Sequence, residues 1–485
     1  QNPELQTPPA PPPNTIDRYR AHGGGRYTDP ILLHARQTQF HTPTHPRADL
    51  AMPNNQPSTS IDIAILGAGA AGLMAAIFAG RTARAGHFAD ASIVALDGAR
   101  TLGAKILVAG GGRCNVTHHE VSETAYAGSS RNAIRKVLRR FDVPRTVEFF
   151  RELGVELKRE ETGKLFPVTD SARTVLNALL GAVREAGAEI RHPWRVAGVE
   201  HEAGATHPFV VHPEDAAQAP IRARRIILAT GGRALPRSGS DGAGYAFARA
   251  LGHTVTERVF PALVPLTLPK DHFLCGLSGL TFDATLEVRG GGGKRLASFT
   301  NSTLCAHFGL SGPSVLDISR YYTDAKRDDA GATLHLNALP GETTESVDAA
   351  LLGLDSQTVA RWLKGRVAQR LGEALCAAAG VDGSTPGHGL TREARRRLAA
   401  TLTALELPVT GDRGFTHAEV TAGGVPLSEI ELRTMESRVT PGLHIIGEIC
   451  DVDGRIGGFN FQWAWASGYV AGTAAAESLA RAAAT

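Results

Sequence analysis

The 485-residue sequence contains no long apolar stretch. None of its aliphatic runs approaches the roughly 20 residues that a transmembrane helix requires. The start of the chain also lacks a charged segment followed by an apolar one, which is the pattern of a secretory signal. We therefore expect no membrane partner and no secretory signal, and we interpret the protein as cytoplasmic.

Cysteine is scarce and widely spaced. The five cysteines are Cys114, Cys275, Cys305, Cys376 and Cys450, and no two of them form a CxxC pair. This spacing argues against a disulfide framework, a zinc site and a thioredoxin-like redox pair. We expect reduced thiols, as is usual for a cytoplasmic protein, and no metal site.

An excess of charge of either sign is also missing. The chain has 51 Lys and Arg residues against 48 Asp and Glu residues, a formal net charge of +3. A dedicated nucleic-acid binder usually carries a clear basic surplus, so nucleic acid is not an expected partner. The 42% hydrophobic and 20% charged composition is that of a globular protein, and a chain of this length predicts two or three domains.

The first 60 residues contain few aliphatic side chains but hold eleven of the 27 prolines. Such a segment cannot bury enough apolar surface to offset the entropy lost when it becomes ordered. We interpret residues 1–60 as a disordered, Pro-rich tail.

A βαβ unit is predicted directly after this tail. Residues 61–66 form an aliphatic run typical of a buried parallel strand, residues 73–84 favour a helix, and residues 92–96 form a second strand. The intervening turn carries a GxGxxG pattern, whose glycines allow a tight turn, close approach of a pyrophosphate and tight helix–strand packing. An acidic residue after the second strand would accept ribose hydroxyls. The predicted contact residues are Gly67, Gly69, Ala70, Ala71, Gly72 and Asp97.

The far end of the chain decides which dinucleotide is bound. Gly447 and Glu448 follow the aliphatic strand at 443–446, and a glycine–acid pair there can hold the ribityl chain of a flavin. The glycine-rich segment 453–458 leads into a helix that begins near Asn460. The positive N-terminus of that helix would stabilise the negative charge of a reduced flavin. NAD enzymes need no such second element, so the sequence predicts FAD.

Between these two ends the pattern of the sequence changes twice. Helices are predicted over 131–155 and 171–187, then residues 260–340 show short alternating strands with a hairpin around 290–293, and residues 345–405 show amphipathic helices. The fold class is therefore predicted to be α/β, with a Rossmann-type FAD-binding domain formed by residues 61–260 and 411–485. A β-rich domain (261–344) and a helical domain (345–410) would be inserted into it.

Seven separated stretches carry a family resemblance. They are residues 67–72, 103–117, 163–170, 229–232, 307–313, 434–437 and 447–465. With these stretches the sequence resembles the BaiN-like family of FAD-dependent, or NAD(P)/FAD-dependent, oxidoreductases, formerly known as flavoproteins of unknown function. The Gly-Gly-Arg-Cys-Asn segment at 111–115 and the C-terminal stretch are highly specific. The family usually has Thr where this chain has Ala306.

The resemblance implies that residues 103–117 lie against the isoalloxazine ring. The glycines at 110–112 would let the backbone approach a planar ligand, and the polar residues after them would supply donors. Cys114 is either a redox thiol or a packing residue, and packing is favoured because no partner cysteine is near in sequence. His307 is a candidate proton donor, with a structural role as the alternative. The further residues predicted to contact FAD are Lys105, Gly112, Arg113, Cys114, Asn115, Thr230, Gly231, Gly447, Glu448, Asp453, Gly458, Asn460 and Phe461.

The predicted function is FAD-dependent redox chemistry on a small organic substrate. In the first hypothesis NAD(P)H is the electron donor and the enzyme reduces an activated C=C bond, as the family's link with bile-acid-type enone reduction implies. In the second, an amine such as aminoacetone reduces FAD and oxygen reoxidises it. In the third, the protein is a flavin-binding sensor without turnover. The sequence contains no second GxGxxG turn for a nicotinamide cofactor.

Overall fold

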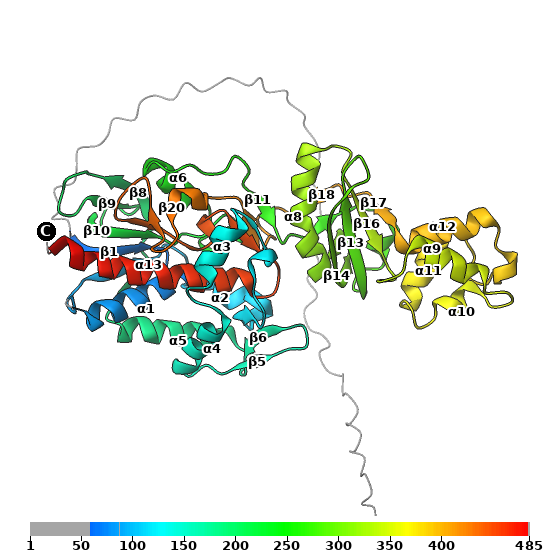
Figure 1. Ribbon diagram of the computed structural model, residues 1–485, viewed down its shortest axis with the longest axis horizontal. Helices are drawn as coiled ribbons and strands as arrows, with labels where there is room; N and C mark the ends of the chain where they lie inside the picture. Colours follow the sequence, from blue (N-terminus) through cyan, green and yellow to red (C-terminus); the bar gives the residue numbers. More distant parts are fainter. Residues whose placement is uncertain (1–58, 87, 484–485) are drawn as a thin grey trace, which may run out of the picture. The chain divides into compact units, whose positions relative to one another are not determined.

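The computed structural model describes residues 59–86 and 88–483 (Figure 1). The predicted disorder of residues 1–60 lies outside the described residues, except that Thr59 and Ser60 begin the first strand. The fold class is α/β, as the sequence predicts.

A largely parallel sheet contains the βαβ unit. Its strand order is β20-β21-β22-β10-β1-β2-β7, and the neighbours from β22 to β7 are parallel, whereas β9 pairs antiparallel with β10 and with β8. The side chains of the central strands are buried on both faces, which is why these strands are almost uniformly aliphatic. The strands are β1 (Thr59–Leu66), β2 (Ile93–Leu96), β7 (Glu189–Arg191), β8 (Val196–His201), β9 (Phe209–Pro213), β10 (Ile221–Leu228), β20 (Ile430–Glu431), β21 (Glu436–Ser437) and β22 (Leu443–Ile445).

Two helices from distant parts of the sequence pack side by side. Figure 1 shows α1 (Ala70–Ala85) and α13 (Phe459–Ala483) lying together along the sheet. A β-carbon on Gly468 would lie 2.6 Å from the Ala71 carbonyl oxygen, and one on Gly472 would lie 2.3 Å from that of Ala75. Glycine is therefore required for this close approach. The packing supports the interpretation that one nucleotide-binding domain is assembled from both segments.

One predicted helix is interrupted. In place of a helix over 131–155, the chain forms α3 (Arg131–Leu138) and α4 (Val143–Glu152). Asp142 caps α4 by accepting a 3.1 Å hydrogen bond from the Arg145 N–H, and Pro144 lies in the first turn. Proline is tolerated there but would break a continuous helix. The remaining elements of this region are α2 (Ala104–Val108), α5 (Ala172–Glu185), α6 (Ala243–Ala250), β3 (Thr117–His118), β4 (Tyr126–Gly128), β5 (Leu157–Arg159), β6 (Lys164–Pro167) and β23 (Val452–Gly454).

A second sheet is formed mainly by the segment predicted to be β-rich. Its strand order is β17-β16-β13-β14-β15-β12-β18, and the predicted hairpin is confirmed by the antiparallel pairing of β13 with β14. The sequence pattern does not indicate the 16-residue helix α8 (Pro313–Asp328), which packs on β14. The strands are β12 (Leu266–Thr267), β13 (Thr281–Arg289), β14 (Arg295–Ala306), β15 (Gly309–Ser311), β16 (Thr333–Asn337), β17 (Leu405–Leu407) and β18 (Gly411–Asp412).

The helical segment shares a core with this second sheet. Leu286 and Leu336 of the sheet belong to the same buried cluster as Leu351 and Leu398 of the helices. The chain then returns to the second sheet through β17 and β18, so we propose that the two inserted modules form one unit ending after Asp412. The helices are α9 (Thr344–Leu352), α10 (Val359–Leu363), α11 (Gln369–Ala378) and α12 (Arg392–Thr403), and the small elements elsewhere in the chain are β11 (Phe260–Ala262), α7 (Phe273–Gly276) and β19 (Val420–Ala422).

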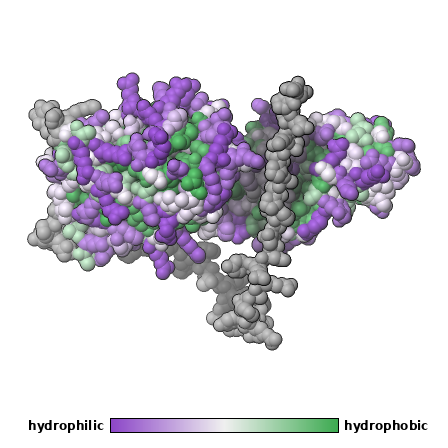
Figure 2. Space-filling view, turned by 90° about the horizontal axis from the view of Figure 1, so that it is seen from below, coloured by the Kyte–Doolittle hydropathy of each residue, from purple (hydrophilic) through white to green (hydrophobic). Residues whose placement is uncertain are grey.

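The surface of the protein mixes polar and apolar areas. On the face drawn in Figure 2, hydrophilic residues dominate and hydrophobic residues form patches between them. Within residues 59–86 and 88–483, no helix combines the length and the apolar character needed to cross a bilayer.

Candidate functional site

A cavity of about 700 Å³ lies at the carboxyl ends of the parallel strands. Its wall includes the turns that follow β1, β2, β10 and β22, which is where α/β sheets bind their ligands. The sequence-predicted residues that line it are Gly67, Gly69, Ala70, Ala71, Asp97, Lys105, Arg113, Asn115, Thr230, Gly231, Gly447, Glu448, Gly458, Asn460 and Phe461.

The three fingerprint glycines have different surroundings. Gly67 has a φ of +99°, and a β-carbon there would lie 2.5 Å from the Ala229 carbonyl oxygen. A β-carbon on Gly72 would lie 1.8 Å from the Gly67 carbonyl oxygen, so this glycine serves helix–strand packing. Gly69 lines the cavity, and no heavy atom lies within 4 Å of the position of its β-carbon. The structure therefore leaves room at Gly69 for a group that approaches the backbone closely.

Asp97 is held in place at the end of β2. Its Oδ2 accepts a 2.7 Å hydrogen bond from the Ala68 N–H, and its Oδ1 accepts one of 2.8 Å from the Ala99 N–H. A carboxylate offers about four lone-pair positions, so both oxygens can still accept hydroxyl groups from the cavity. This geometry fits the predicted contact with a ribose.

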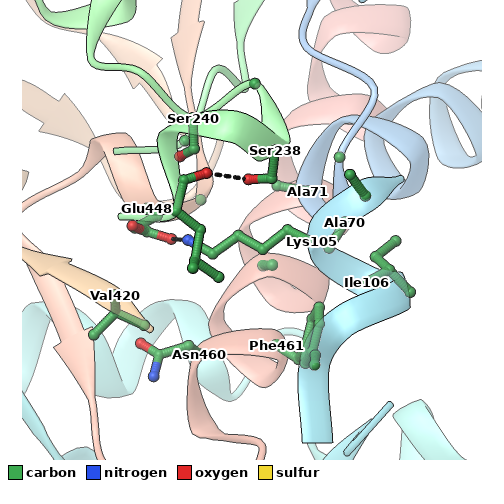
Figure 3. Close-up of a pocket in the computed structure, with 18 of the residues that line it drawn as sticks. Ala70, Ala71, Lys105, Ile106, Ser238, Ser240, Val420, Glu448, Asn460 and Phe461 are labelled. Atoms are coloured by element: carbon green, nitrogen blue, oxygen red, sulfur yellow. Dashed lines mark hydrogen bonds and ion pairs between the residues drawn. The ribbon is translucent and has the colours of Figure 1, made fainter. Parts of the chain in front are cut away.

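Lys105 and Glu448 meet across the cavity wall. Figure 3 shows the Lys105 side chain, on α2, reaching the Glu448 carboxylate that follows β22. The other carboxylate oxygen of Glu448 accepts a 3.0 Å hydrogen bond from the Thr421 N–H of β19. Both charges are thus partnered, and the pair joins two segments that lie 343 residues apart in the sequence.

Several buried polar atoms around the cavity have no hydrogen-bond partner among the described residues. They are Asn115 Oδ1, Thr230 Oγ1 and Ser240 Oγ. A buried polar group without a hydrogen bond costs roughly 1–3 kcal/mol, so such atoms usually have a partner outside the chain. Together with the open position at Gly69 and the oriented Asp97 carboxylate, they fit FAD, whose hydroxyl and phosphate groups would bind there.

The turn before α13 forms another part of the wall. Asn460 closes this turn, because its Oδ1 accepts a 2.8 Å hydrogen bond from the Gly454 N–H. Gly458 has a φ of +97°, and its β-carbon would lie 2.5 Å from the backbone carbonyl carbon of Thr117. Phe461 stacks on Trp465, with ring centroids 5.4 Å apart. The wall is therefore preformed by contacts within the protein.

Arg113 lines the cavity, but its charge is engaged by the protein. Its Nη1 donates a 2.6 Å hydrogen bond to Glu160 and lies 3.6 Å from an oxygen of Asp170. The guanidinium also stacks over the Phe166 ring, 4.0 Å from its centroid. Two carboxylates offset much of the positive charge of Arg113, and a direct contact between its guanidinium and the flavin stays a prediction.

Five predicted residues, Cys114 among them, do not line the cavity. Gly72 packs against Gly67, Gly112 turns the backbone with a φ of +85°, and His307 is exposed in the turn between β14 and β15. Asp453 is buried, and its Oδ2 accepts a 2.6 Å hydrogen bond from Arg320 of α8. Gly72 and Asp453 therefore have structural contacts in place of the predicted contact with FAD, and the predicted roles of Gly112, Cys114 and His307 stay predictions.

Cys114 is a fully buried side chain on a backbone with a φ of +60°. Burial raises the pKa of its thiol to about 12, so the thiolate is not formed near neutral pH. We expect native protein to resist alkylation at Cys114 and Cys114→Ser to retain FAD. Mass spectrometry after iodoacetamide treatment, compared with denatured protein, checks this expectation. Rapid native alkylation of Cys114 would favour the redox-thiol hypothesis instead.

Other residues line the cavity that the sequence did not single out. Leu263, Pro313 and Leu316 provide apolar surface, while Lys164 and Glu419 bring charge. These residues come from β6, α8 and the loops beside β11 and β19, which are far apart in the sequence. No single motif therefore predicts that they meet. Within the described residues, no group of His, Cys, Asp or Glu side chains is arranged to hold a metal ion.

The comparisons with known proteins cover most of the chain. The family model described as the HI0933-like protein Rossmann domain matches residues 61–474. The chain is 35% identical over 419 residues to the 3-dehydro-bile acid delta(4,6)-reductase of Clostridium scindens, covering 86% of this chain and 99% of that protein. It is 31% identical over 417 residues to the ribosomal RNA dihydrouridine synthase of Escherichia coli, covering 84% and 96%.

Proposed function

Because the chain belongs to the HI0933-like family of FAD-binding flavoprotein oxidoreductases, we propose that it reduces a C=C bond conjugated with a carbonyl group. The observation that carries this proposal is the chemistry shared by its relatives. One is named as a reductase of a 3-dehydro-bile acid and the other as a synthase of dihydrouridine. Dihydrouridine differs from uridine by reduction of a C=C bond next to a carbonyl, so both names fit one reaction class.

The cavity supports this reaction class. The fingerprint turn and Asp97 would bind the FAD phosphates and ribose, and the segments around Lys105 and Glu448 would hold the flavin. Reduced FAD supplies a hydride when bound. The apolar side chain of Leu316 would exclude water from the bound substrate, and a cationic side chain such as Lys164 would attract its carbonyl oxygen.

The electron donor and the size of the substrate are further parts of the proposal. We propose NAD(P)H as donor and a small organic molecule as substrate, in line with the reductase relative. The expectation that nucleic acid is not a partner stays a prediction, because other relatives are named for ribosomal RNA.

Anaerobic stopped-flow absorbance tests the proposal. We expect NADH or NADPH to bleach the oxidised flavin, and a cyclic enone or an unmodified ribosomal RNA fragment, added next, to restore it. Restoration by the enone alone supports a small substrate, and restoration by the RNA alone overturns that part. Bleaching by a small amine, with recovery only in oxygen, would instead establish the oxidase hypothesis.

A further inference from the structure

Glu419 brings a carboxylate to the wall of the cavity. It immediately precedes β19, and its backbone N–H donates a 3.1 Å hydrogen bond to the Leu263 carbonyl oxygen. This bond fixes the backbone from which the side chain projects. Among the described residues, no group forms an ion pair or hydrogen bond with its carboxylate, in contrast to Glu448, both of whose oxygens are engaged.

Of the charged groups around Glu419 in the described part of the chain, some are already bound to other residues of the protein and one is free to interact with a ligand. The charged groups that face it are Lys105 of α2, Lys164 of β6 and Asp317 of α8. Lys105 is bound to Glu448, and Asp317 accepts hydrogen bonds of 3.1 and 3.0 Å from Arg455. Lys164 lines the same cavity and, within the described residues, has no carboxylate at ion-pair distance.

The protonation state of Glu419 follows from these surroundings. The side chain of Glu419 is exposed at the cavity, and desolvation of its carboxyl group by the surrounding protein raises the pKa of Glu419 above its ordinary value. Lys105 and Lys164 oppose the rise, and Asp317 adds to it. The side chain nevertheless remains accessible from the cavity. A carboxyl group that holds its proton to higher pH, yet can be reached by a substrate, has the properties of a general acid.

The other candidate acids at this cavity are less suitable. His417 also lines it, but its Nε2 lies 2.7 Å from Nη2 of Arg413. Because a guanidinium can only donate, this ring nitrogen must accept and cannot carry a proton to deliver. Its Nδ1 lies 3.1 Å from the Arg413 carbonyl oxygen, to which it would donate. Cys114 is buried away from the cavity, and His307 is not among the lining residues.

We propose that Glu419 is the proton donor of the reductase reaction, which rests on the function proposed above. The substrate's β-carbon accepts the hydride, and the electron pair of the C=C bond moves toward the carbonyl. The α-carbon then takes the proton from Glu419, leaving a saturated carbonyl compound, oxidised FAD and a Glu419 carboxylate. Water returns the proton to Glu419, and NAD(P)H returns two electrons to FAD as a hydride. Lys164 faces Glu419 and has no carboxylate partner among the described residues, so it would stabilise the negative charge that develops on the carbonyl oxygen.

The proposal is tested with Glu419→Gln, which keeps the shape of the side chain but has no proton of this acidity to give. Glu373→Gln, at an exposed position of α11, is the control for the charge change. Each holoprotein is reduced and mixed with either a cyclic enone or a nitroalkene. A nitroalkene becomes a stable nitronate anion after hydride transfer, so its reduction needs no proton at carbon.

We expect Glu419→Gln to slow reoxidation by the enone by about 10²–10⁴-fold and to leave FAD content and the nitroalkene rate unchanged. Equal rates with the enone in Glu419→Gln and wild type would overturn the role of Glu419 and leave the proposed function standing. Equal slowing with both acceptors would also overturn it, because Glu419 would then act in binding or hydride transfer. Wild-type protein that reduces neither acceptor would contradict the proposed function itself.

A readout without turnover completes the test. Infrared difference spectroscopy across a pH titration detects the C=O stretch of a protonated carboxyl group. Buried aspartates such as Asp453 contribute to this absorbance as well, so we expect Glu419→Gln to lose one component, persisting above the usual Glu range near about pH 4.3, that wild type and Glu373→Gln share. An absorbance in Glu419→Gln equal to that of the wild type across the titration would overturn the assignment.

Discussion

Gly69→Val yields a folded protein that no longer binds FAD. Gly69 has a φ of −78°, which any residue can adopt, and its β-carbon would point into open space beside the cavity. The valine methyl groups would therefore occupy the place where a pyrophosphate approaches the backbone. Each hydrogen bond to a charged group contributes about 1.5–3 kcal/mol, so losing two weakens binding by roughly 10²–10⁴-fold.

Two variants separate this effect from loss of the fold. Gly69 is the N-cap residue of α1, where valine is less favourable than glycine. Gly69→Asp supplies a capping side chain but fills the same space and repels phosphate, so we expect it to fold and to lose FAD as well. Gly72→Val is the contrast, because its β-carbon would lie 1.8 Å from a backbone oxygen and should destabilise even the apoprotein. Flavin released on denaturation and the melting temperature of the apoprotein measure the two effects. Full FAD occupancy in Gly69→Val would contradict the prediction.

The parts of the fold that were predicted are those fixed by short-range patterns. The strand, glycine turn and helix around Gly67 and Gly72 depend on neighbours within a few residues, so their spacing is visible in the sequence. The helix α8 was missed because it begins at Pro313, directly after a strand-rich stretch, and its inner face includes the polar residues Asp317 and Ser319. Its burial depends on partners far along the chain.

The directions in which individual side chains of the site point were harder to predict from the sequence than the fold. Arg113 follows the glycines that line the cavity, yet its guanidinium binds Glu160, 47 residues away. The side chain of Cys114 is buried in the core, and its backbone has a positive φ. No sequence motif predicts either feature. Glu419 reaches the cavity from a loop that the sequence placed only within a broad domain. Local chemistry therefore predicts the cofactor, whereas long-range packing decides which side chains face the substrate.

The second prediction with a large effect concerns the ion pair between α8 and β23. Arg320 donates a 2.6 Å hydrogen bond to Oδ2 of Asp453, and Oδ1 of Asp453 has no partner within the described residues. Asp453 is only 4% exposed. Burial raises the pKa of Asp453 and Arg320 opposes that rise, so the arginine is what keeps a charge tolerable at this position.

We expect Arg320→Ala to destabilise the protein by about 3–5 kcal/mol, because it leaves a buried carboxylate without its partner. The folded-state pKa of Asp453 would then rise further above the unfolded value of about 3.9. Folded protein would hold a proton that unfolded protein has released, so stability would fall as the pH rises through this interval. The loss in melting temperature should accordingly be larger near about pH 8 than near about pH 5.

Calorimetry of three further variants distinguishes this cause from a general loss of packing. Arg258→Ala removes an exposed arginine that pairs with Asp324 and Asp328 of α8, and should have a much smaller effect. Asp453→Asn, with Arg320 retained, should lose the part of the pH dependence that comes from Asp453, because no carboxyl group remains at this position. The double variant Arg320→Met, Asp453→Leu should recover much of the stability, since apolar side chains of similar volume can replace a buried ion pair. If Arg320→Ala lowers the melting temperature equally at both pH values, the arginine acts by filling space, and its charge does not stabilise Asp453.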